Sequence, residues 1–279
     1  MKLNDKEIER IIVTAFKEDI GNGDITTNLI VGKNQKASAY LLVKEDGIIA
    51  GLPVAKKVFQ NLDKDIFWKD LVKEGEFVKA GARIAEVKGT LRALLTGERT
   101  ALNLLQRISG IATITSRFVE IAKITNAKIL DTRKTVPGLR LLDKYAVNVG
   151  GGTNHRIGLY DMVLIKDNHI KAAGSITEAV TKVKRGLRKK IKIEVETTNL
   201  DEVREAINSS VDIIMFDNMT VKMMNEAVKI INGKIKTEAS GNVNLKTLRS
   251  IAETGVDYIS VGALTHSVKA LDINMKIDN

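Results

Sequence analysis

Short apolar runs alternate with amphipathic stretches from Lys128 to the C-terminal region. Six runs have the length and composition of buried strands: AKILD, DMVLIK, KIEVE, DIIMF, IKTEAS and DYISVG. Glu196 and Asp217 are 21 residues apart, as are Asp217 and Glu238, which leaves room for one strand and one return helix. The pattern predicts an α/β fold of repeated βα units, either a parallel barrel or a doubly wound sheet. We favour the barrel, because no GxGxxG motif follows the first strand.

The N-terminal part of the chain has a different pattern. Residues 36–52 and 73–89 look like strands broken by glycine turns, and residues 54–62 have helical spacing between them. This predicts a small α+β domain. A helical stretch from Thr96 to Lys123 leads into the βα repeat, and we expect Thr96 to be its N-cap, since threonine is a preferred capping residue.

The composition is that of an ordinary globular protein, with 44% hydrophobic and 28% charged residues. No apolar stretch approaches the roughly 20 residues that a membrane helix needs. The N-terminal segment has the spacing of an amphipathic helix, with Ile8, Ile11 and Ile12 on one face, instead of a signal-peptide core, so we expect a cytoplasmic protein. The lack of cysteine excludes disulfides, zinc–thiolate sites and cysteine nucleophiles.

The net charge of +10 suits either nucleic acid or an acidic small molecule as a partner. Much of the basic excess is scattered over predicted helix faces, as between Lys182 and Lys190, where a solvated surface is the default. Aromatic residues make up only 4% of the chain and do not interleave with the lysines. This weakens the case for a surface that stacks nucleic acid bases.

Polar residues follow the predicted strands, and the carboxyl ends of parallel strands meet at one mouth. The strand ends are Asp131-Thr132-Arg133-Lys134, Lys166-Asp167-Asn168-His169, Glu196, Asp217-Asn218, Ser240-Gly241-Asn242 and Gly262-Ala263. A buried unpaired charge costs several kcal/mol, so the cations Arg133, Lys134, Arg156 and Lys166 must meet opposite charges. Each alone is more often a surface ion-pair partner. Four together predict a ligand rich in carboxylate or phosphate.

Two carboxylates close successive strands at the same mouth. Glu196 and Asp217 could hold a magnesium ion or stabilise a developing positive charge. The alternative is a pair of structural salt bridges to Lys166 and Arg133, which accounts equally well for either acid alone but less well for both together.

Two glycine-containing loops have the composition of phosphate cradles, because backbone N–H groups at such turns approach an anion closely. They are Ser240-Gly241-Asn242 and Val261-Gly262-Ala263. Barrels commonly bind phosphate at their last two loops, although helix caps use the same residues. Among the histidines, His155 could orient a ligand or act as an acid, while His169 and His266 are expected to be structural.

With these residues in view, the chain resembles the quinolinate phosphoribosyltransferase family over nearly its whole length. The resemblance is carried by GDITT at 23–27, GERTALNLLQRISGIAT at 97–113, TRKTVPGLRLLDKYAV at 132–147, GGGTNHRIGL at 150–159, LIKDNH at 164–169, and IEVE, FDNM, EASGN and SVGALTHS. It implies an N-terminal α/β sandwich domain over residues 1–108 and an open (β/α) barrel over 109–267, with residues 268–279 able to pack back on the first domain.

The resemblance also implies the chemistry. Family members are pentosyltransferases that convert quinolinate and phosphoribosyl pyrophosphate, with Mg²⁺, to nicotinate mononucleotide, pyrophosphate and CO₂ in de novo NAD biosynthesis. They form homodimers with shared active sites, and hexamers are an open alternative.

Residue roles follow from the same resemblance. By it Arg133, His155, Arg156 and Lys166 surround quinolinate, and Arg99 comes from a partner subunit. Lys134 serves the phosphoribosyl pyrophosphate, and Thr132 is a further substrate-binding residue. Glu196 and Asp217 lie near ribose and magnesium, and the 5'-phosphate is held by Ser240, Gly241, Asn242, Val261, Gly262 and Ala263. Lys134, Glu196 and Asp217 are the expected catalytic residues.

Some alternatives remain open on the sequence. Glu194 competes with Glu196, which we prefer because its spacing to Asp217 fits the family. Ser209-Ser210 stands where the family usually has Ala-Gly. A relative associated with molybdenum transport shares the TRKT and HR elements, but the intact LIKDNH argues against it. A rival of another class is a nucleic-acid-binding barrel, whose binding would weaken steeply with salt.

Overall fold

The computed structural model describes residues 3–278; residues 1, 2 and 279, which fall in the predicted first domain and tail, lie outside the described residues. The chain forms two compact units. The first contains the residues up to Ser116, Thr135–Gly151 and the residues from Ser267 onward, and the second contains Arg117–Lys134 and Gly152–His266. The predicted boundary at residue 108 would cut a continuous helix, α4 (Leu91–Ala122).

The first unit contains a four-stranded antiparallel sheet with the order β12-β1-β5-β3. Its strands are β1 (Lys36–Val43), β3 (Phe67–Asp70), β5 (Arg83–Thr90) and β12 (Ile273–Ile277), and a small second sheet pairs β2 (Gly47–Ile48) with β4 (Phe77–Val78). Buried and more exposed residues alternate along β1, because successive side chains point to opposite faces of a strand. The sheet therefore has one face in the core.

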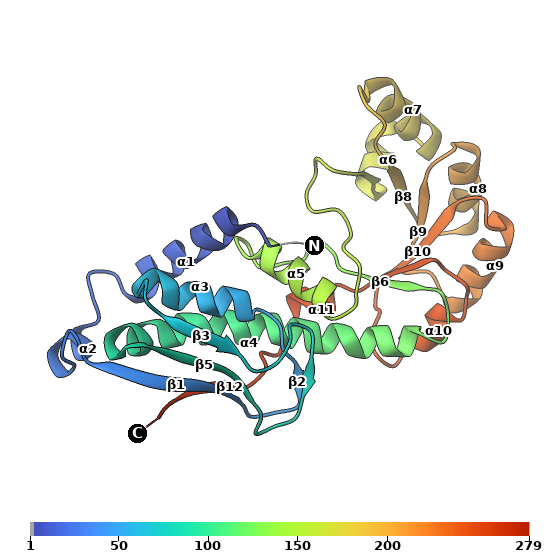
Figure 1. Cartoon of the computed structure of the whole chain (residues 1–279). Helices are drawn as coiled ribbons and strands as arrows, with labels where there is room; N and C mark the ends of the chain where they lie inside the picture. Colours follow the sequence, from blue (N-terminus) through green and yellow to red (C-terminus); the bar gives the residue numbers. More distant parts are fainter. Residues whose placement is uncertain (1–2, 279) are drawn as a thin grey trace. The chain divides into compact units, whose positions relative to one another are not determined.

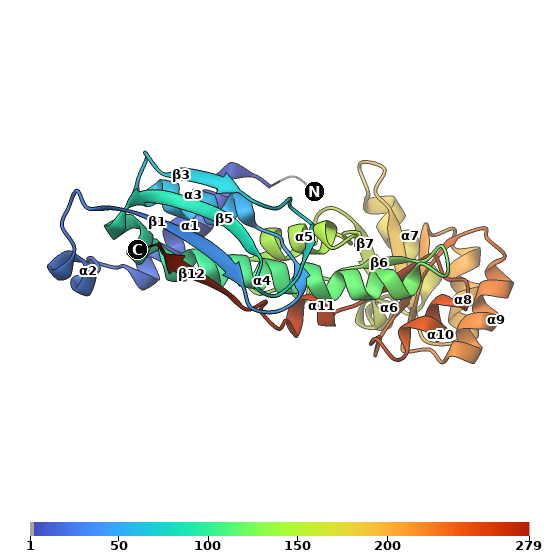
Figure 2. The ribbon, with the colours of Figure 1, turned by 60° about the horizontal axis from the view of Figure 1, so that its bottom comes forward.

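Helices cover that face, as Figure 1 and Figure 2 show for α1, α3 and α4. The helices of this unit are α1 (Asp5–Asp19), α2 (Ile25–Ile30), α3 (Leu52–Leu62), the first part of α4, and α5 (Arg140–Val149). The apolar face predicted near the N-terminus is confirmed, since Ile8, Ile11 and Ile12 are buried on α1. Phe59 of α3 meets Trp68 of β3 with ring centroids 6.1 Å apart.

The start of α4 differs from the predicted N-cap. The helix begins at Leu91, five residues before Thr96, so Thr96 lies inside it. The Thr96 hydroxyl instead donates a 3.0 Å hydrogen bond to Asp24, the residue that caps α2. The residues Leu91–Leu95 are strong helix formers, so the helix extends past the capping signal.

The second unit is built on a six-stranded parallel sheet with the order β6-β11-β10-β9-β8-β7. The strands are β6 (Lys128–Leu130), β7 (Val163–Ile165), β8 (Ile193–Thr197), β9 (Ile213–Asp217), β10 (Lys236–Ser240) and β11 (Tyr258–Ser260). The order ends at β6 and β7, which do not pair with each other among the described residues. This confirms the predicted fold class, an N-terminal sandwich with an open α/β barrel.

Helices alternate with these strands: α6 (Asp167–Ala173), α7 (Ile176–Gly186), α8 (Leu200–Asn208), α9 (Val221–Ile231), α10 (Leu248–Ala252) and α11 (Ala263–His266). Figure 1 shows α8 and α9 on the outer side of β8, β9 and β10. Ser175, Asn199 and Thr220 accept hydrogen bonds from the first turns of α7, α8 and α9, as N-caps do. The sequence therefore starts each return helix with a local signal.

The gap between β6 and β7 is occupied by the segment Thr153–Met162. Thr153 pairs with β6, accepting from Asp131 N and donating to the Ile129 carbonyl at 2.8 Å. Farther along, the Arg156 Nη1 donates to the carbonyl of Met162, one residue before β7. The open side of the barrel thus carries the His-Arg pair of the sequence.

None of the described helices is both long and apolar enough to cross a membrane.

Candidate active site

A cavity of about 940 Å³ opens at the carboxyl ends of the parallel strands in the second unit. Its wall includes thirteen of the predicted site residues: Thr132, Arg133, Lys134, His155, Arg156, Lys166, Glu196, Asp217, Ser240, Gly241, Asn242, Gly262 and Ala263. This volume lies at the upper end of the range for small-molecule sites. Residues dispersed over more than a hundred positions meet here because parallel strands end at a common mouth.

The cations of the cavity lie close enough to influence one another. Arg156 is buried, and desolvation together with the nearby Arg133 charge lowers the pKa of its guanidinium. Lys166 follows β7 and forms an ion pair with Glu196 of β8. Two neighbouring guanidinium groups repel each other unless an anion lies between them, so this part of the wall favours a carboxylate or phosphate ligand.

The carboxylates follow the strands as predicted, and neighbouring residues hold them. Glu196 pairs with Lys166, the structural alternative raised from the sequence, yet the pair lies in the cavity wall. Asp217 accepts a 3.1 Å hydrogen bond from the side chain of Asn218. Asn218 has a φ of 54° and in turn accepts from Asn242. Asn218 therefore links the end of β9 to the loop after β10.

The loop after β10 approaches Asn218 at the end of β9 so closely that it requires glycine at position 241. Gly241 has a φ of +95°, and a Cβ there would lie 2.2 Å from Oδ1 of Asn218. After the neighbouring strand β11, a Cβ on Gly262 would lie 3.0 Å from His266 and 3.1 Å from Lys134. Backbone without side chains at both places lets a ligand approach the main-chain N–H groups.

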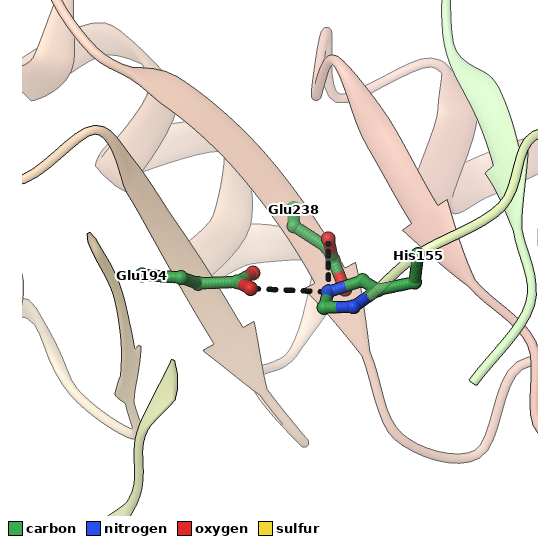
Figure 3. Close-up of side chains that lie close together, drawn as sticks. All are labelled: His155, Glu194 and Glu238. Atoms are coloured by element: carbon green, nitrogen blue, oxygen red, sulfur yellow. Dashed lines mark hydrogen bonds and ion pairs between the residues drawn. The ribbon is translucent and has the colours of Figure 1, made fainter. Parts of the chain in front are cut away.

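A buried cluster lies below the cavity, where His155 meets two acids (Figure 3). Its Nε2 lies 3.0 Å from Oε2 of Glu194 and 3.5 Å from Oε2 of Glu238, and both carboxyl groups are fully buried. Nδ1 accepts a 2.8 Å hydrogen bond from the backbone N–H of Arg156. Ser260 donates to Oε1 of Glu238 at 2.5 Å. Both ring nitrogens of His155 are thus occupied by protein groups.

These contacts define where the protons lie. Although desolvation lowers the pKa of His155, the facing carboxylates raise it overall. The contact at Nδ1 acts in the opposite direction, because a second ring proton there would remove the hydrogen bond that the Arg156 N–H donates. This geometry favours a single ring proton, on Nε2. Burial raises the pKa of Glu194 to about 7.

Three donor atoms of His155, Glu194 and Glu238 lie within 4.8 Å of one another, close enough to bind a cation. The direct 3.0 Å contact between Nε2 and Glu194 is a hydrogen-bond distance, so a shared proton accounts for it. The predicted metal pair, Glu196 and Asp217, is separate from this cluster and lines the cavity. Glu194 is buried and does not line the cavity, whereas Glu196 does. This difference distinguishes the two candidate acids.

Other predicted residues lie elsewhere. Val261 is fully buried, and Arg99 is an exposed residue of α4 in the first unit. His169 accepts a 3.0 Å hydrogen bond from the Lys166 backbone N–H, a capping role that matches its structural interpretation. His266 was expected to be structural only, but it lines the cavity.

The sequence interpretation assigned no role to several other lining residues, among them Asn218 and Thr198. Asn218 directly follows Asp217 at a strand end, which is a signal that could have found it.

The comparisons with known proteins match this geometry. Residues 24–109 match the N-terminal domain of quinolinate phosphoribosyl transferase, and residues 111–276 match its C-terminal domain. The chain belongs to the quinolinate phosphoribosyltransferase family. The two domain matches meet at residue 110, near the predicted boundary. The compact units of the structure differ from them, because residues 135–151 belong to the first unit.

Similar proteins are known from bacteria and plants. A probable nicotinate-nucleotide pyrophosphorylase (carboxylating) of Bacillus subtilis is 46% identical over 99% of this chain and 95% of its own length. A quinolinate phosphoribosyltransferase (decarboxylating) of Nicotiana tabacum, named as mitochondrial, is 46% identical over 98% of this chain and 82% of its own. The structure of the nicotinate-nucleotide pyrophosphorylase from Francisella tularensis has a TM-score of 0.95 at 44% identity, covering 99% and 98% of the two chains.

The protein is accordingly a pentosyltransferase. It transfers phosphoribosyl from phosphoribosyl pyrophosphate to quinolinate with loss of CO₂, giving nicotinate mononucleotide and pyrophosphate for NAD biosynthesis.

Proposed function

We propose that this reaction takes place in the cavity of the second unit. The observation that supports this assignment most is the convergence of four cationic side chains with two carboxylates at the ends of neighbouring strands. A dicarboxylate and a substrate with three phosphates need many cations, whereas the ribose needs negative charge beside it in the transition state. One cavity contains both kinds of group.

Quinolinate lies between the guanidinium groups of Arg133 and Arg156 in this proposal, with Lys166 as a third cation. A planar guanidinium matches a carboxylate with two parallel hydrogen bonds. The burial of Arg156 places one carboxylate in a desolvated setting, which favours its later loss as CO₂. The resemblance had placed His155 among these groups, and it does line the cavity, but its ring nitrogens are already occupied.

Phosphoribosyl pyrophosphate occupies the other side of the cavity. Lys134 and Thr132 serve its pyrophosphate, and the loops Ser240–Asn242 and Val261–Ala263 hold the 5'-phosphate through backbone N–H groups. The close approach at Gly241 and Gly262 supports this assignment, because a side chain there would block an anion. Val261 acts through its backbone, since its side chain is buried.

Glu196 and Asp217 face the developing charge on the ribose. When pyrophosphate departs, the sugar becomes an oxocarbenium-like cation that nearby carboxylates stabilise. Carboxylate oxygens are also the ligands that Mg²⁺ prefers, so these two residues fit a magnesium ion. When bound, the ion would help to neutralise the pyrophosphate. Lys134, on the leaving-group side, would do the same as a fixed charge.

The assembly and location are part of the proposal. We infer a homodimer in which Arg99 of a second copy completes the quinolinate pocket, an assignment supported by the exposure of Arg99 on α4. Hexamers of such dimers and a cytoplasmic location stay predictions. Size-exclusion chromatography with light scattering tests the assembly, and cell fractionation tests the location.

The experiment for the site measures CO₂ and nicotinate mononucleotide from quinolinate and phosphoribosyl pyrophosphate, with nicotinate as control substrate. Wild type should form product with quinolinate and not with nicotinate. EDTA should abolish product formation until Mg²⁺ is restored. Glu196→Gln and Asp217→Asn should each lower kcat at least about a hundredfold, the scale for loss of a group that stabilises transition-state charge. Glu253→Gln, at the exposed residue directly after α10, is the matched control. Unchanged kcat in both site variants would refute the assignment.

A further inference from the structure

The segment that carries Arg156 crosses the open side of the barrel, where ordinary strand pairing is interrupted. Its backbone pairs with β6 at Thr153. Beyond that point the backbone no longer pairs with a strand, and hydrogen bonds to buried side chains hold the segment instead. Three fully buried acids from three different strands provide the acceptors: Asp131 directly after β6, Glu194 within β8 and Glu238 within β10.

Asp131 holds the start of the segment. Its Oδ1 accepts the backbone N–H of His155 at 2.9 Å, and its Oδ2 accepts the side-chain amide of Asn154 at 2.6 Å. A carboxylate that accepts two hydrogen bonds in a buried setting is a strong and directional anchor. It fixes the backbone immediately before Arg156.

Glu194 and Glu238 hold the ring of His155. Figure 3 shows both carboxylates pointing at the same edge of the imidazole, at Nε2. The opposite nitrogen, Nδ1, accepts the N–H of Arg156. The ring therefore connects two acids deep in the barrel to the backbone of the arginine. Hydrogen bonds to buried acids on one side and a main-chain donor on the other leave the imidazole a single orientation.

We propose that Asp131, Glu194 and Glu238 are positioning residues that fix the segment Asn154–Arg156, and that His155 is their link to Arg156 and gives no ring nitrogen to the substrate. The inference rests on the proposed binding of quinolinate by Arg156. It extends that proposal in two ways. Three buried acids contribute to quinolinate affinity by positioning Arg156, and His155 makes no direct hydrogen bond to quinolinate. His155 meets the ligand through its ring carbons only.

The tautomer of His155 is the first test, and it needs no substrate. The chain has three histidines, so ¹⁵N-histidine labelling gives a simple spectrum, and His155→Asn assigns the signals. We expect one protonated nitrogen, Nε2, and one unprotonated nitrogen, Nδ1, in the free enzyme and again with quinolinate. A proton on Nδ1, or a change of tautomer when quinolinate binds, would overturn the proposal. Because the free-enzyme spectrum does not depend on quinolinate, it tests the positioning proposal separately from the proposed quinolinate site.

Enzyme kinetics provide the second test. Glu194→Leu removes the acceptor and should raise the KM for quinolinate about tenfold or more, since loss of a hydrogen bond to a charged group has that size. Glu194→Gln keeps an oxygen that accepts from Nε2, and its amide would face Glu238, whose carboxylate lies within 4.8 Å. It should stay within about threefold of wild type. A purely structural defect would change the KM for phosphoribosyl pyrophosphate as well, whereas we expect that KM to change less than about threefold.

A double-mutant cycle separates the indirect route from a direct one. If Glu194 acts through the imidazole, Glu194→Leu should raise the KM for quinolinate by less than about twofold when His155 is already replaced by Phe. Fully additive effects, or a Glu194→Gln variant as impaired as Glu194→Leu, would refute the proposal. Glu253→Leu controls for removal of an acid, because Glu253 is half exposed and directly follows α10. If Glu194→Leu does not fold by circular dichroism, the NMR test and Glu194→Gln still decide.

Discussion

Gly241→Ala tests the phosphate loop most directly, because two separable effects follow from the structure. The first is backbone strain: φ is +95°, where an L side chain costs about 1–2 kcal/mol. The second is contact: the new Cβ would lie 2.2 Å from Oδ1 of Asn218 and 2.9 Å from its backbone nitrogen. Real Cβ atoms do not approach that closely, so the loop after β10 must move away from the end of β9.

The strain lowers stability whether or not a substrate is bound, whereas the displacement changes binding. Moving the loop should remove at least one hydrogen bond to a charged phosphate, about 1.5–3 kcal/mol. That corresponds to an increase in the KM for phosphoribosyl pyrophosphate of about 10- to 150-fold. The KM for quinolinate should change much less, because its proposed ligands come from other loops.

Gly174→Ala is the matched control. Gly174 also has a left-handed φ, +108°, but a Cβ there would meet nothing within 4 Å. Steady-state kinetics with each substrate varied in turn, together with thermal melting, compares the two variants. Gly241→Ala should lose at least as much stability as Gly174→Ala, because it adds a steric clash to the same kind of backbone strain, and only Gly241→Ala should lose affinity for phosphoribosyl pyrophosphate. An unchanged KM in a folded Gly241→Ala enzyme would show that this loop does not bind phosphate.

Three further predictions concern stability, assembly and quinolinate recognition. Asp143→Ala should lower the free energy of unfolding by about 3–5 kcal/mol, because it leaves a partly buried arginine of α4 without the carboxylate that it contacts at 2.8 Å; urea denaturation checks this, with the exposed Asp201→Ala as a control that should change it by less than about 1 kcal/mol. Arg99→Ala and Lys166→Ala enzymes, each inactive alone, should recover activity when mixed, and no recovery would contradict a shared site. Arg156→Lys should raise the KM for quinolinate about tenfold while the KM for phosphoribosyl pyrophosphate stays within about threefold, since lysine lacks the two parallel donors; equal changes in both would count against the assignment.

The comparison of Glu194 with Glu196 shows where prediction from sequence ends. The two residues are two positions apart on β8, so their side chains point to the same face of the strand. Alternation therefore cannot distinguish them. Depth along the barrel does, because Glu196 reaches the cavity whereas Glu194 is buried one layer lower beside His155. Depth is a property of how six strands are staggered, which no local pattern contains.

The boundary between the two units illustrates a similar limit. Apolar spacing in α4 continues through residue 108 without a break, so the sequence offers no signal for a unit that ends at Ser116. Residues 135–151 follow a strand end of the barrel, yet they pack in the first unit. There, Asp143 accepts two hydrogen bonds from Arg107 of α4. Long-range ion pairs of this kind join segments that the order of the chain separates.

Hydrophobic periodicity and strand-end chemistry were sufficient to predict the βα repeat, the shared mouth and most of the residues around the cavity, because each of these is encoded within a few neighbouring positions. The conformation of Asn218, the closed access to the nitrogens of His155 and the three buried acids that hold Arg156 depend on contacts between residues 23 to 83 positions apart. Such contacts arise from strand order, register and close packing. They therefore became visible only once the chain was folded.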